Sequence, residues 1–241
     1  MSEAIMSGRG VSISFGGMKA VDGVDFDLRE GEILGLIGPN GAGKTTLFNI
    51  ISGFLQASGG EIIFGGGKIS GLKPDKICRA GIARTFQSAR NFPGFTVRDN
   101  VLMGALFGKP GKTRAQAERT ADSTLEFTGL DKYAGMYVSD IPLSAQKRLE
   151  VARALATEPR VLMLDEVMAG LNPAEVEDAM ALVREIRGRG VSVIMIEHVM
   201  KAIMSICDRI IALHHGRLIA DGAPSEITEN KQVAEIYLGE A

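Results

Sequence analysis

The chain has 241 residues, of which 45% are hydrophobic and 23% are charged, so it can bury a sizeable core as one large domain or as one domain with an inserted lobe. This composition excludes disordered and collagen-like proteins. The 27 basic and 29 acidic residues give a formal net charge of -2 without a long run of one sign, which argues against a nucleic-acid partner.

Neither the cysteines nor the apolar runs indicate a secreted or membrane-spanning chain. Cys78 and Cys207 are the only cysteines, and their wide separation supports neither a disulfide framework nor a zinc site. The runs "VSVIMI" and "VLML" are far shorter than the roughly 18 residues that a membrane span needs, and the N-terminus lacks an apolar signal core. We expect a soluble, cytoplasmic chain.

The first elements predicted along the chain are two half-buried strands. Residues 11–15 (VSISF) and 24–28 (VDFDL) alternate apolar and polar side chains, which favours an antiparallel lead-in. Residues 32–38 (EILGLIG) form a nearly continuous apolar run, as expected for a strand buried on both faces of a parallel sheet. The segment 43–53 then predicts a helix that Gly53 closes.

The middle of the chain is predicted to be mostly helical. Residues from about 72 to 156 have helical patterns that are broken at Pro93, at Gly94 and in the loop 107–113. We interpret this part as an inserted helical lobe.

Strands and helices alternate again after the lobe. The buried-strand candidates 161–165, 191–197 and 209–213 are separated by helical patterns at 173–190 and 199–208. We therefore expect one α/β domain with a mainly parallel sheet. Its catalytic core comprises about 1–86 and 157–241, and its helical subdomain about 87–156.

A glycine-rich loop follows the first buried strand and opens a helix. It fits the phosphate-loop pattern of glycine, four residues, glycine, lysine and serine or threonine. Glycines let successive backbone N–H groups converge on phosphate oxygens, and the helix N-terminus adds positive charge. We expect Lys44 to reach the β and γ phosphates and Thr45 to offer a hydroxyl to Mg²⁺. The predicted nucleotide-binding residues are Gly38, Pro39, Asn40, Gly41, Ala42, Gly43, Lys44, Thr45 and Thr46.

Two adjacent carboxylates end the apolar strand "VLMLDE". Asp165 and Glu166 should lie at the carboxyl edge of the sheet, where ligands of open α/β sheets bind. Asp165 can hold Mg²⁺ through water, while Glu166 orients or deprotonates the attacking water. The alternative is a strand that ends in solvated acids, which the neighbouring phosphate loop disfavours.

Three single residues complete the candidate set. Gln87 could reach Mg²⁺ or the water through its amide, and His198 could hydrogen-bond the γ-phosphate. Phe15 could stack on a base. Each also has an ordinary alternative: a surface glutamine, a hydrogen-bonded histidine and a core aromatic.

Taken together, "GPNGAGKTT", "TFQ", "LS…RLEVARAL", "VLMLDE", "GLNP" and "IEH" resemble, in this order, the nucleotide-binding subunit of an ATP-binding-cassette (ABC) transporter. The resemblance covers essentially the whole chain and implies a P-loop ATPase fold with ATP and Mg²⁺ as cofactors. It makes Phe15 the base-stacking aromatic, Gln87 the coupling glutamine and His198 the switch histidine. It also makes Asp165 the magnesium ligand and Glu166 the general base, with Lys44 as a further catalytic residue.

Longer stretches of the sequence resemble one branch of that family. "GIARTFQSARNFPGFTVRDNV" and the ending "IYLGE" are similar to importer subunits for branched-chain and related amino acids. The resemblance implies a dimer with an identical or related subunit, membrane permease partners, and an indirect link to an external solute-binding protein. It also implies a peripheral location on the inner face of the cell membrane, with no nucleic-acid partner.

One stretch departs from the family pattern. The family has Leu-Ser-Gly-Gly-Gln or a close variant, whereas Leu143-Ser144 is followed at once by Ala145-Gln146. Two helical residues correspond to about 200° of rotation and 3 Å of rise, so Ser144 would not face as the family serine does unless the loop rearranges. Either the chain closes poorly on ATP, or two residues of a mobile loop are missing from this sequence, an alternative that an intact mass would decide.

Two other functions are alternatives to that of an importer ATPase. A soluble cassette ATPase acting on nucleic acid or ribosomes usually carries a long coiled coil or two tandem cassettes, for which this chain has no room. A nucleotide-binding module with impaired hydrolysis is suggested only by the shortened segment at Ser144.

Overall fold

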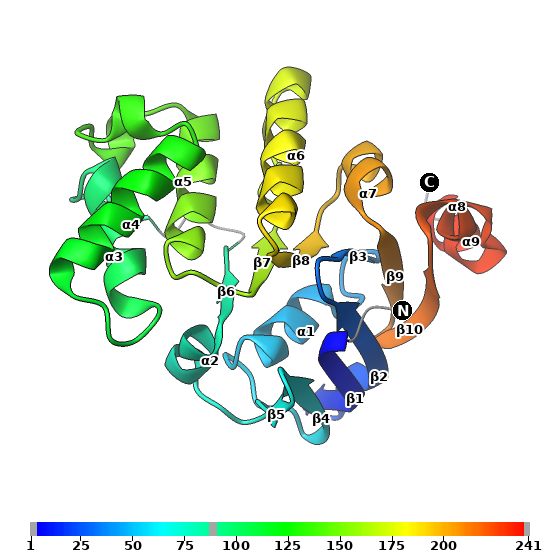
Figure 1. The fold of residues 1–241 in the computed structure, drawn as a ribbon. Coiled ribbons are helices and arrows are strands. Elements are labelled where there is room, and N and C mark those ends of the chain that lie inside the picture. Colours follow the sequence, from blue (N-terminus) through cyan, green and yellow to red (C-terminus); the bar gives the residue numbers. More distant parts are fainter. Residues whose placement is uncertain (1–3, 87–90, 239–241) are drawn as a thin grey trace. The chain divides into compact units, whose positions relative to one another are not determined.

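The structure is a computed structural model that describes residues 4–86 and 91–238 (Figure 1). The chain divides into two compact units, one within residues 1–74 and 192–241 and the other within residues 75–191. The segment 87–156, expected to form a helical subdomain, lies inside the second unit, which extends further in both directions. None of the helices in the described part of the chain has both the length and the apolar character needed to cross a membrane.

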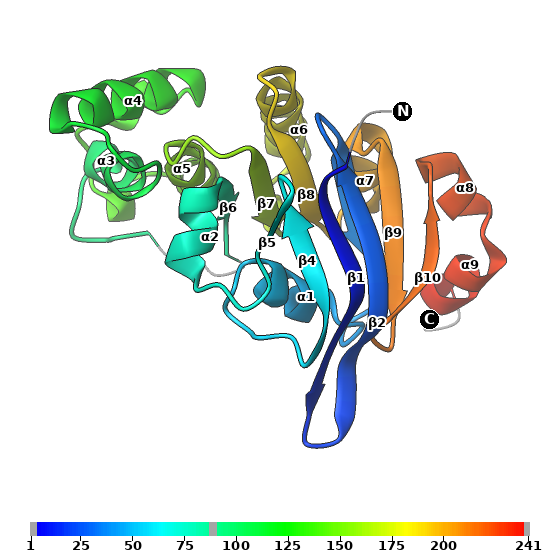
Figure 2. The same ribbon diagram turned by 60° about the horizontal axis from the view of Figure 1, so that its bottom comes forward.

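The first unit begins with an antiparallel sheet of strand order β2-β1-β4-β5 (Figure 2). Alternation over residues 11–14 places one face inward, because Val11 and Ile13 of β1 are buried while Ser12 is half-buried and Ser14 is exposed. This confirms the predicted antiparallel lead-in. The strands are β1 (Ala4–Phe15), β2 (Met18–Arg29), β4 (Gly59–Phe64) and β5 (Gly67–Lys68).

The first unit also contains strands in the order β10-β9-β3-β8, of which β9, β3 and β8 run parallel. Every residue of β3 and β8 is buried, which is why these strands read as continuous apolar runs. The strands are β3 (Ile33–Ile37), β8 (Ser192–Ile196), β9 (Arg209–His214) and β10 (Arg217–Gly222), and the helices of this unit are α1 (Lys44–Ile51), α7 (Met200–Ile206), α8 (Pro224–Glu229) and α9 (Lys231–Leu238).

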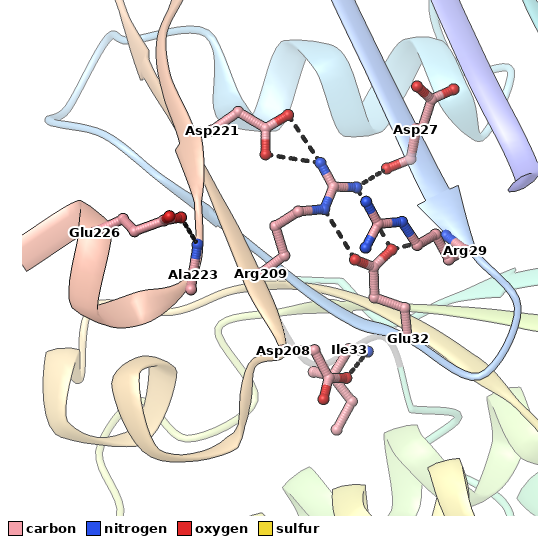
Figure 3. A network of polar contacts seen from close by, with 9 residues as sticks. All are labelled: Asp27, Arg29, Glu32, Ile33, Asp208, Arg209, Asp221, Ala223 and Glu226. Carbon is pink, nitrogen blue, oxygen red and sulfur yellow. Dashed lines mark hydrogen bonds and ion pairs between the residues drawn. The ribbon is translucent and has the colours of Figure 1, made fainter. Parts of the chain in front are cut away.

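Arg209 of β9 joins strands β10 and β2 of the first unit to Glu32, the residue before β3 (Figure 3). The Arg209 guanidinium donates to the Glu32 carboxylate at 2.9 Å and to both Asp221 oxygens at 2.7 and 2.8 Å. It also donates to the backbone carbonyl of Asp27. Burial disfavours the Arg209 cation, but the hydrogen bonds to Glu32 and Asp221 outweigh it and raise the Arg209 pKa.

The second unit pairs a short parallel ribbon with a helical lobe. Strand β6 (Ile82–Arg84) pairs in parallel with β7 (Val161–Asp165), with Arg84 opposite Met163. The helical elements of this unit, with α2 starting at the boundary, are α2 (Pro74–Ala80), α3 (Val97–Phe107), α4 (Arg114–Phe127), η1 (Asp131–Tyr133), η2 (Val138–Asp140), α5 (Leu143–Leu155) and α6 (Pro173–Gly188).

The lobe has its own core, and its helices begin at recognisable caps. Small and branched apolar side chains of α3, α4 and α5 form one buried cluster. Thr113 and Gln116 form a capping box at the start of α4, and Asn172 and Glu175 form one at the start of α6. These signals confirm the predicted helices and the predicted loop before α4.

Glu150 is an exception to the apolar packing of α5. Its side chain is only 2% exposed, and neither carboxylate oxygen has a hydrogen-bond partner among the described residues. Burial raises the Glu150 pKa from its ordinary value of 4.5 to about 7, against the opposing charges of Lys147 and Arg153. The folded state therefore holds more protons than the unfolded state between these values, and the free energy of unfolding falls as pH rises through that window.

We predict that Glu150→Gln raises the free energy of unfolding more at pH 8 than at pH 5. The neutral amide removes the cost of burying a charge, which is on the order of 2 kcal/mol at pH 8 and vanishes below the unfolded pKa. Urea denaturation at both pH values measures this difference. Glu126→Gln on the exposed face of α4 is the control, and an equal effect of Glu150→Gln at both pH values would contradict the prediction.

Candidate functional site

The predicted phosphate loop joins the end of β3 to the start of α1 in the first unit. A Cβ on Gly43, whose φ is 102°, would lie 2.4 Å from the Ala20 carbonyl oxygen. A Cβ on Gly38 would lie 2.3 Å from the Leu213 carbonyl oxygen. These positions require glycine because neighbouring backbone leaves no space for a side chain. The loop is also tied to the β9–β10 turn, where the Gly216 N–H donates to the Ala42 carbonyl at 3.0 Å.

Lys44 folds back over this loop. Its ammonium donates to the carbonyl oxygens of Gly38 at 2.5 Å and Pro39 at 2.9 Å, and the residue is only 7% exposed. A buried cation at the N-terminus of α1 favours an anion there. Of the other predicted residues of the loop, Ala42 is buried, Pro39 and Thr46 are half-buried, and Asn40, Gly41 and Thr45 are exposed.

His198 follows a strand that neighbours β3. Strands β3 and β8 run parallel with Gly35 opposite Met195, so the phosphate loop and His198 leave the sheet at the same carboxyl edge. His198 is exposed and lies outside regular structure. The structure thus places His198 at the edge where the predicted phosphate loop begins.

Phe15 is the last residue of β1. Its side chain is 46% exposed, so the alternative that it is a core residue is wrong. The β1–β2 turn leads into Ala20, whose carbonyl oxygen would lie 2.4 Å from a Cβ on Gly43. Phe15 is therefore a surface aromatic on the hairpin that packs against the loop.

The acidic candidates lie in the second unit, at the end of β7. The Asp165 carboxylate pairs with the Arg84 guanidinium through Oδ2 at 3.0 Å, and the Asp165 N–H donates to the Thr85 hydroxyl at 2.9 Å. The other carboxylate oxygen, Oδ1, is buried without a hydrogen-bond partner among the described residues. Burial raises the Asp165 pKa, while the Arg84 charge opposes this shift. The alternative of solvated acids is therefore wrong for Asp165.

Glu166 follows Asp165 with an unusual backbone. Its φ of 53° lies in the left-handed region, which costs a non-glycine residue about 1 kcal/mol. The half-buried residue accepts a hydrogen bond at its carbonyl from Lys147 Nζ at 3.4 Å. Strained residues cluster at active sites, so this turn is a candidate for catalytic function.

Ser144 is the second residue of α5 and lies directly after Leu143. Pro142 occupies the N-cap position without a side-chain cap, and its carbonyl accepts the Gln146 N–H at 3.0 Å. A backbone hydrogen bond from Asn172 and a side-chain hydrogen bond from Ser144 lower the Glu175 pKa. Ser144 thus contacts the first turn of α6.

The structure therefore gathers the predicted residues into two groups, one in each unit. Gln87 lies outside the described residues. The sequence reasoning missed Arg84, Thr85 and Lys147 as neighbours of the acidic pair. The only signal for the first two was their place beside Gln87 in "ARTFQ", because their contacts depend on the pairing of β6 with β7.

Comparison with known proteins identifies this arrangement. The family model described as "ABC transporter" matches residues 21–169, and a model described as "Branched-chain amino acid ATP-binding cassette transporter" matches residues 217–241. The chain is similar over its full length, and over the full length of each relative, to two high-affinity branched-chain amino acid transport ATP-binding proteins. They are BraF of Pseudomonas aeruginosa, at 42% identity, and LivG of Escherichia coli strain K12, at 40%.

Solved structures agree with the sequence comparison. A crystal structure of the ADP conformation of an ATP-binding cassette of an ABC transporter matches with a TM-score of 0.90 and 30% identity, covering 99% of this chain and 100% of that one. A nucleotide-free cassette matches with a TM-score of 0.89 and 29% identity, covering 98% and 99%. The loop that carries Lys44, the strand that ends at Asp165 and these full-length similarities lead to one conclusion: the chain belongs to the ABC transporter family of ATP-binding cassettes.

Proposed function

We propose that this chain is the ATP-binding and hydrolysing subunit of an ABC importer for branched-chain or related amino acids. The substrate class comes from the relatives, which are branched-chain amino acid transport ATP-binding proteins aligned end to end with this chain. The C-terminal match to the branched-chain model supports the same class. These relatives do not favour a soluble ATPase that acts on nucleic acid or ribosomes.

The geometry of the phosphate loop carries the proposal. The close backbone approaches at Gly38 and Gly43 fix a tight loop, and Lys44 lies over it. ATP would bind with its phosphates on the loop amides and on Lys44, and its adenine on the exposed ring of Phe15. The hydroxyls of Thr45 and Thr46 would lie at the first turn of α1, beside the phosphates.

The residues present fit a magnesium ion. The Asp165 Oδ1 is a buried carboxylate oxygen without a partner among the described residues, and hard carboxylate and hydroxyl oxygens are suited to Mg²⁺. Thr45 and Asp165 would hold the ion together with phosphate oxygens and water, and we propose that Gln87 contributes its amide oxygen. When bound, the ion neutralises charge on the transferring phosphoryl group.

Hydrolysis requires a base and charge stabilisation. Glu166 would accept a proton from the attacking water, and its strained backbone would fix the direction of the carboxylate. Lys44 and His198 would stabilise the negative charge of the transferring group. Two subunits would sandwich ATP, with the start of α5 at Ser144 facing the nucleotide of the other subunit.

The proposed partners are membrane permease subunits, with a solute-binding protein linked indirectly through them. This chain would be cytoplasmic and peripheral on the inner membrane face. Phe92 and Phe95, which are 41% and 45% exposed, form an edge-to-face pair with ring centroids 5.9 Å apart. The buried Asn100 fixes their turn, because its Oδ1 accepts from the Phe92 N–H at 2.8 Å. This preorganised aromatic surface would dock on the permease.

We predict that Gly43→Ala abolishes measurable nucleotide binding, because the new Cβ would displace the loop from Ala20. Equilibrium titration with a fluorescent ATP analogue measures this loss. Gly66→Ala is the matched control, since Gly66 also has a positive φ of 79° but meets nothing within 4 Å. Equal affinities of the two variants would contradict the role of the loop.

We predict that Glu166→Gln slows single-turnover ATP hydrolysis by at least about 100-fold, because it removes the general base, while ATP binding is retained and favours a stable dimer. Single-turnover assays with and without the permease, together with light scattering in ATP, measure both effects. Turnover at the parent rate would show that Glu166 is not the base. Failure of the parent chain to hydrolyse ATP in either assay would instead favour a binding module with impaired hydrolysis.

We predict that Phe95→Ala weakens association with the permease by roughly tenfold or more, as truncation of a central aromatic at an interface does, without altering ATPase activity of the isolated chain. Affinity for the permease in detergent measures the first effect. Phe107→Ala removes another exposed phenylalanine of the same unit and should leave association unchanged. Equal affinities for both variants would contradict this docking surface.

A further inference from the structure

The Arg84–Asp165 ion pair is not used in the chemistry above. Its two side chains are 7% and 2% exposed, and the Arg84 N–H donates to Asp165 Oδ2 at 3.0 Å. A buried ion pair constrains the geometry of both groups, because water is not present to take over the hydrogen bonds of either one. The orientation of the Asp165 carboxylate is therefore set by Arg84.

Arg84 is itself held in place by its neighbours. Its Nε donates to the Thr85 carbonyl at 3.1 Å, and its guanidinium lies 4.6 Å from the centre of the Phe86 ring. The backbone beneath Asp165 is fixed as well, since the Thr85 N–H donates to the Met163 carbonyl at 2.9 Å and the Thr85 hydroxyl accepts the Asp165 N–H. Strand β6 thus holds the end of β7 through both side chain and backbone.

The two oxygens of the Asp165 carboxylate differ in their surroundings. Oδ2 is occupied by Arg84, whereas Oδ1 is buried without a partner among the described residues. With one oxygen anchored, the carboxylate cannot rotate freely, and the second oxygen is directed at one place. Carboxylates that ligate metals directly or through water are commonly oriented in this way by an outer partner, and loss of such a partner typically costs 10–100-fold in metal affinity or activity.

We propose that Arg84 is a positioning residue for the magnesium site, which anchors Oδ2 of Asp165 so that Oδ1 is presented to the ion. The inference rests on the proposed role of Asp165 as a magnesium ligand. Arg84 touches neither the nucleotide nor the reacting water. It acts through Asp165, and the ion pair persists when the metal is bound.

The affinity of Mn²⁺ for the protein–ADP complex tests this proposal, with the free ion measured by electron paramagnetic resonance. Mn²⁺ takes the same oxygen ligands as Mg²⁺. We expect Arg84→Gln to weaken Mn²⁺ binding by about 10- to 100-fold, and Arg84→Lys, which keeps the charge without the fork, to weaken it less. ADP affinity in EDTA should stay unchanged for both variants.

Two further variants separate the possible causes. Arg98→Gln removes another arginine–carboxylate pair of the second unit, between Arg98 and Asp122 in the helical lobe, and should leave Mn²⁺ affinity at the parent value. Asp165→Asn should weaken Mn²⁺ binding at least as much as Arg84→Gln. If Asp165→Asn binds Mn²⁺ as the parent does, the proposed metal role of Asp165 fails.

If Asp165→Asn loses affinity but Arg84→Gln does not, the proposal for Arg84 is overturned while the proposed function stands. The proposal would also be overturned if Arg84→Gln lost ADP affinity in EDTA by the same factor as Mn²⁺ affinity, since the substitution would then disturb the whole binding site and not the metal ligand alone. Should Arg84→Gln not fold, Arg84→Lys decides the question, and parent Mn²⁺ affinity in that variant counts against positioning.

Discussion

Two backbone carbonyls hold the Lys44 ammonium above the turn between β3 and α1, and the proposed chemistry depends on this arrangement. The turn can be this tight only because Gly38 and Gly43 lack side chains where Leu213 and Ala20 approach. Those approaches come from β9 and β2, which the Arg209 network joins through Asp27. A feature of a few residues is thus supported by strands distant in sequence. An anion bound in the loop would replace these carbonyl oxygens as the hydrogen-bond acceptor of Lys44, and a hydrogen bond between two charged groups is stronger.

Lys44 in the first unit is basic, whereas the candidate residues at the end of β7 in the second unit are acidic. Its acidic pair ends a fully buried strand, so the Asp165 carboxylate is withdrawn from water and held by Arg84. Glu166, one residue further, leaves the strand through a left-handed turn. Adjacent carboxylates therefore have different surroundings, one anchored and buried and the other half-buried on a strained turn. That difference suits a metal ligand beside a general base.

Much of this could be predicted from the sequence, because each predicted feature has a local cause. Continuous apolar runs predicted β3, β7 and β8, and the glycine pattern predicted a tight loop between β3 and α1. Contacts between distant segments could not be predicted this way. Nothing in the order of residues indicates that Arg84 meets Asp165, or that Ser144 contacts Glu175 at the start of α6. The exposure of Phe15 could not be predicted either, because it depends on where the β1–β2 hairpin turns.

Calorimetric titration of the purified chain with ATP, with and without Mg²⁺, tests the central claim most directly. The account predicts saturable binding of one nucleotide by each chain, strengthened by the metal, because the loop amides and Lys44 bind the phosphates and Asp165 serves the ion. Folded protein that gave no saturable heat with magnesium-bound ATP would contradict the account at its base.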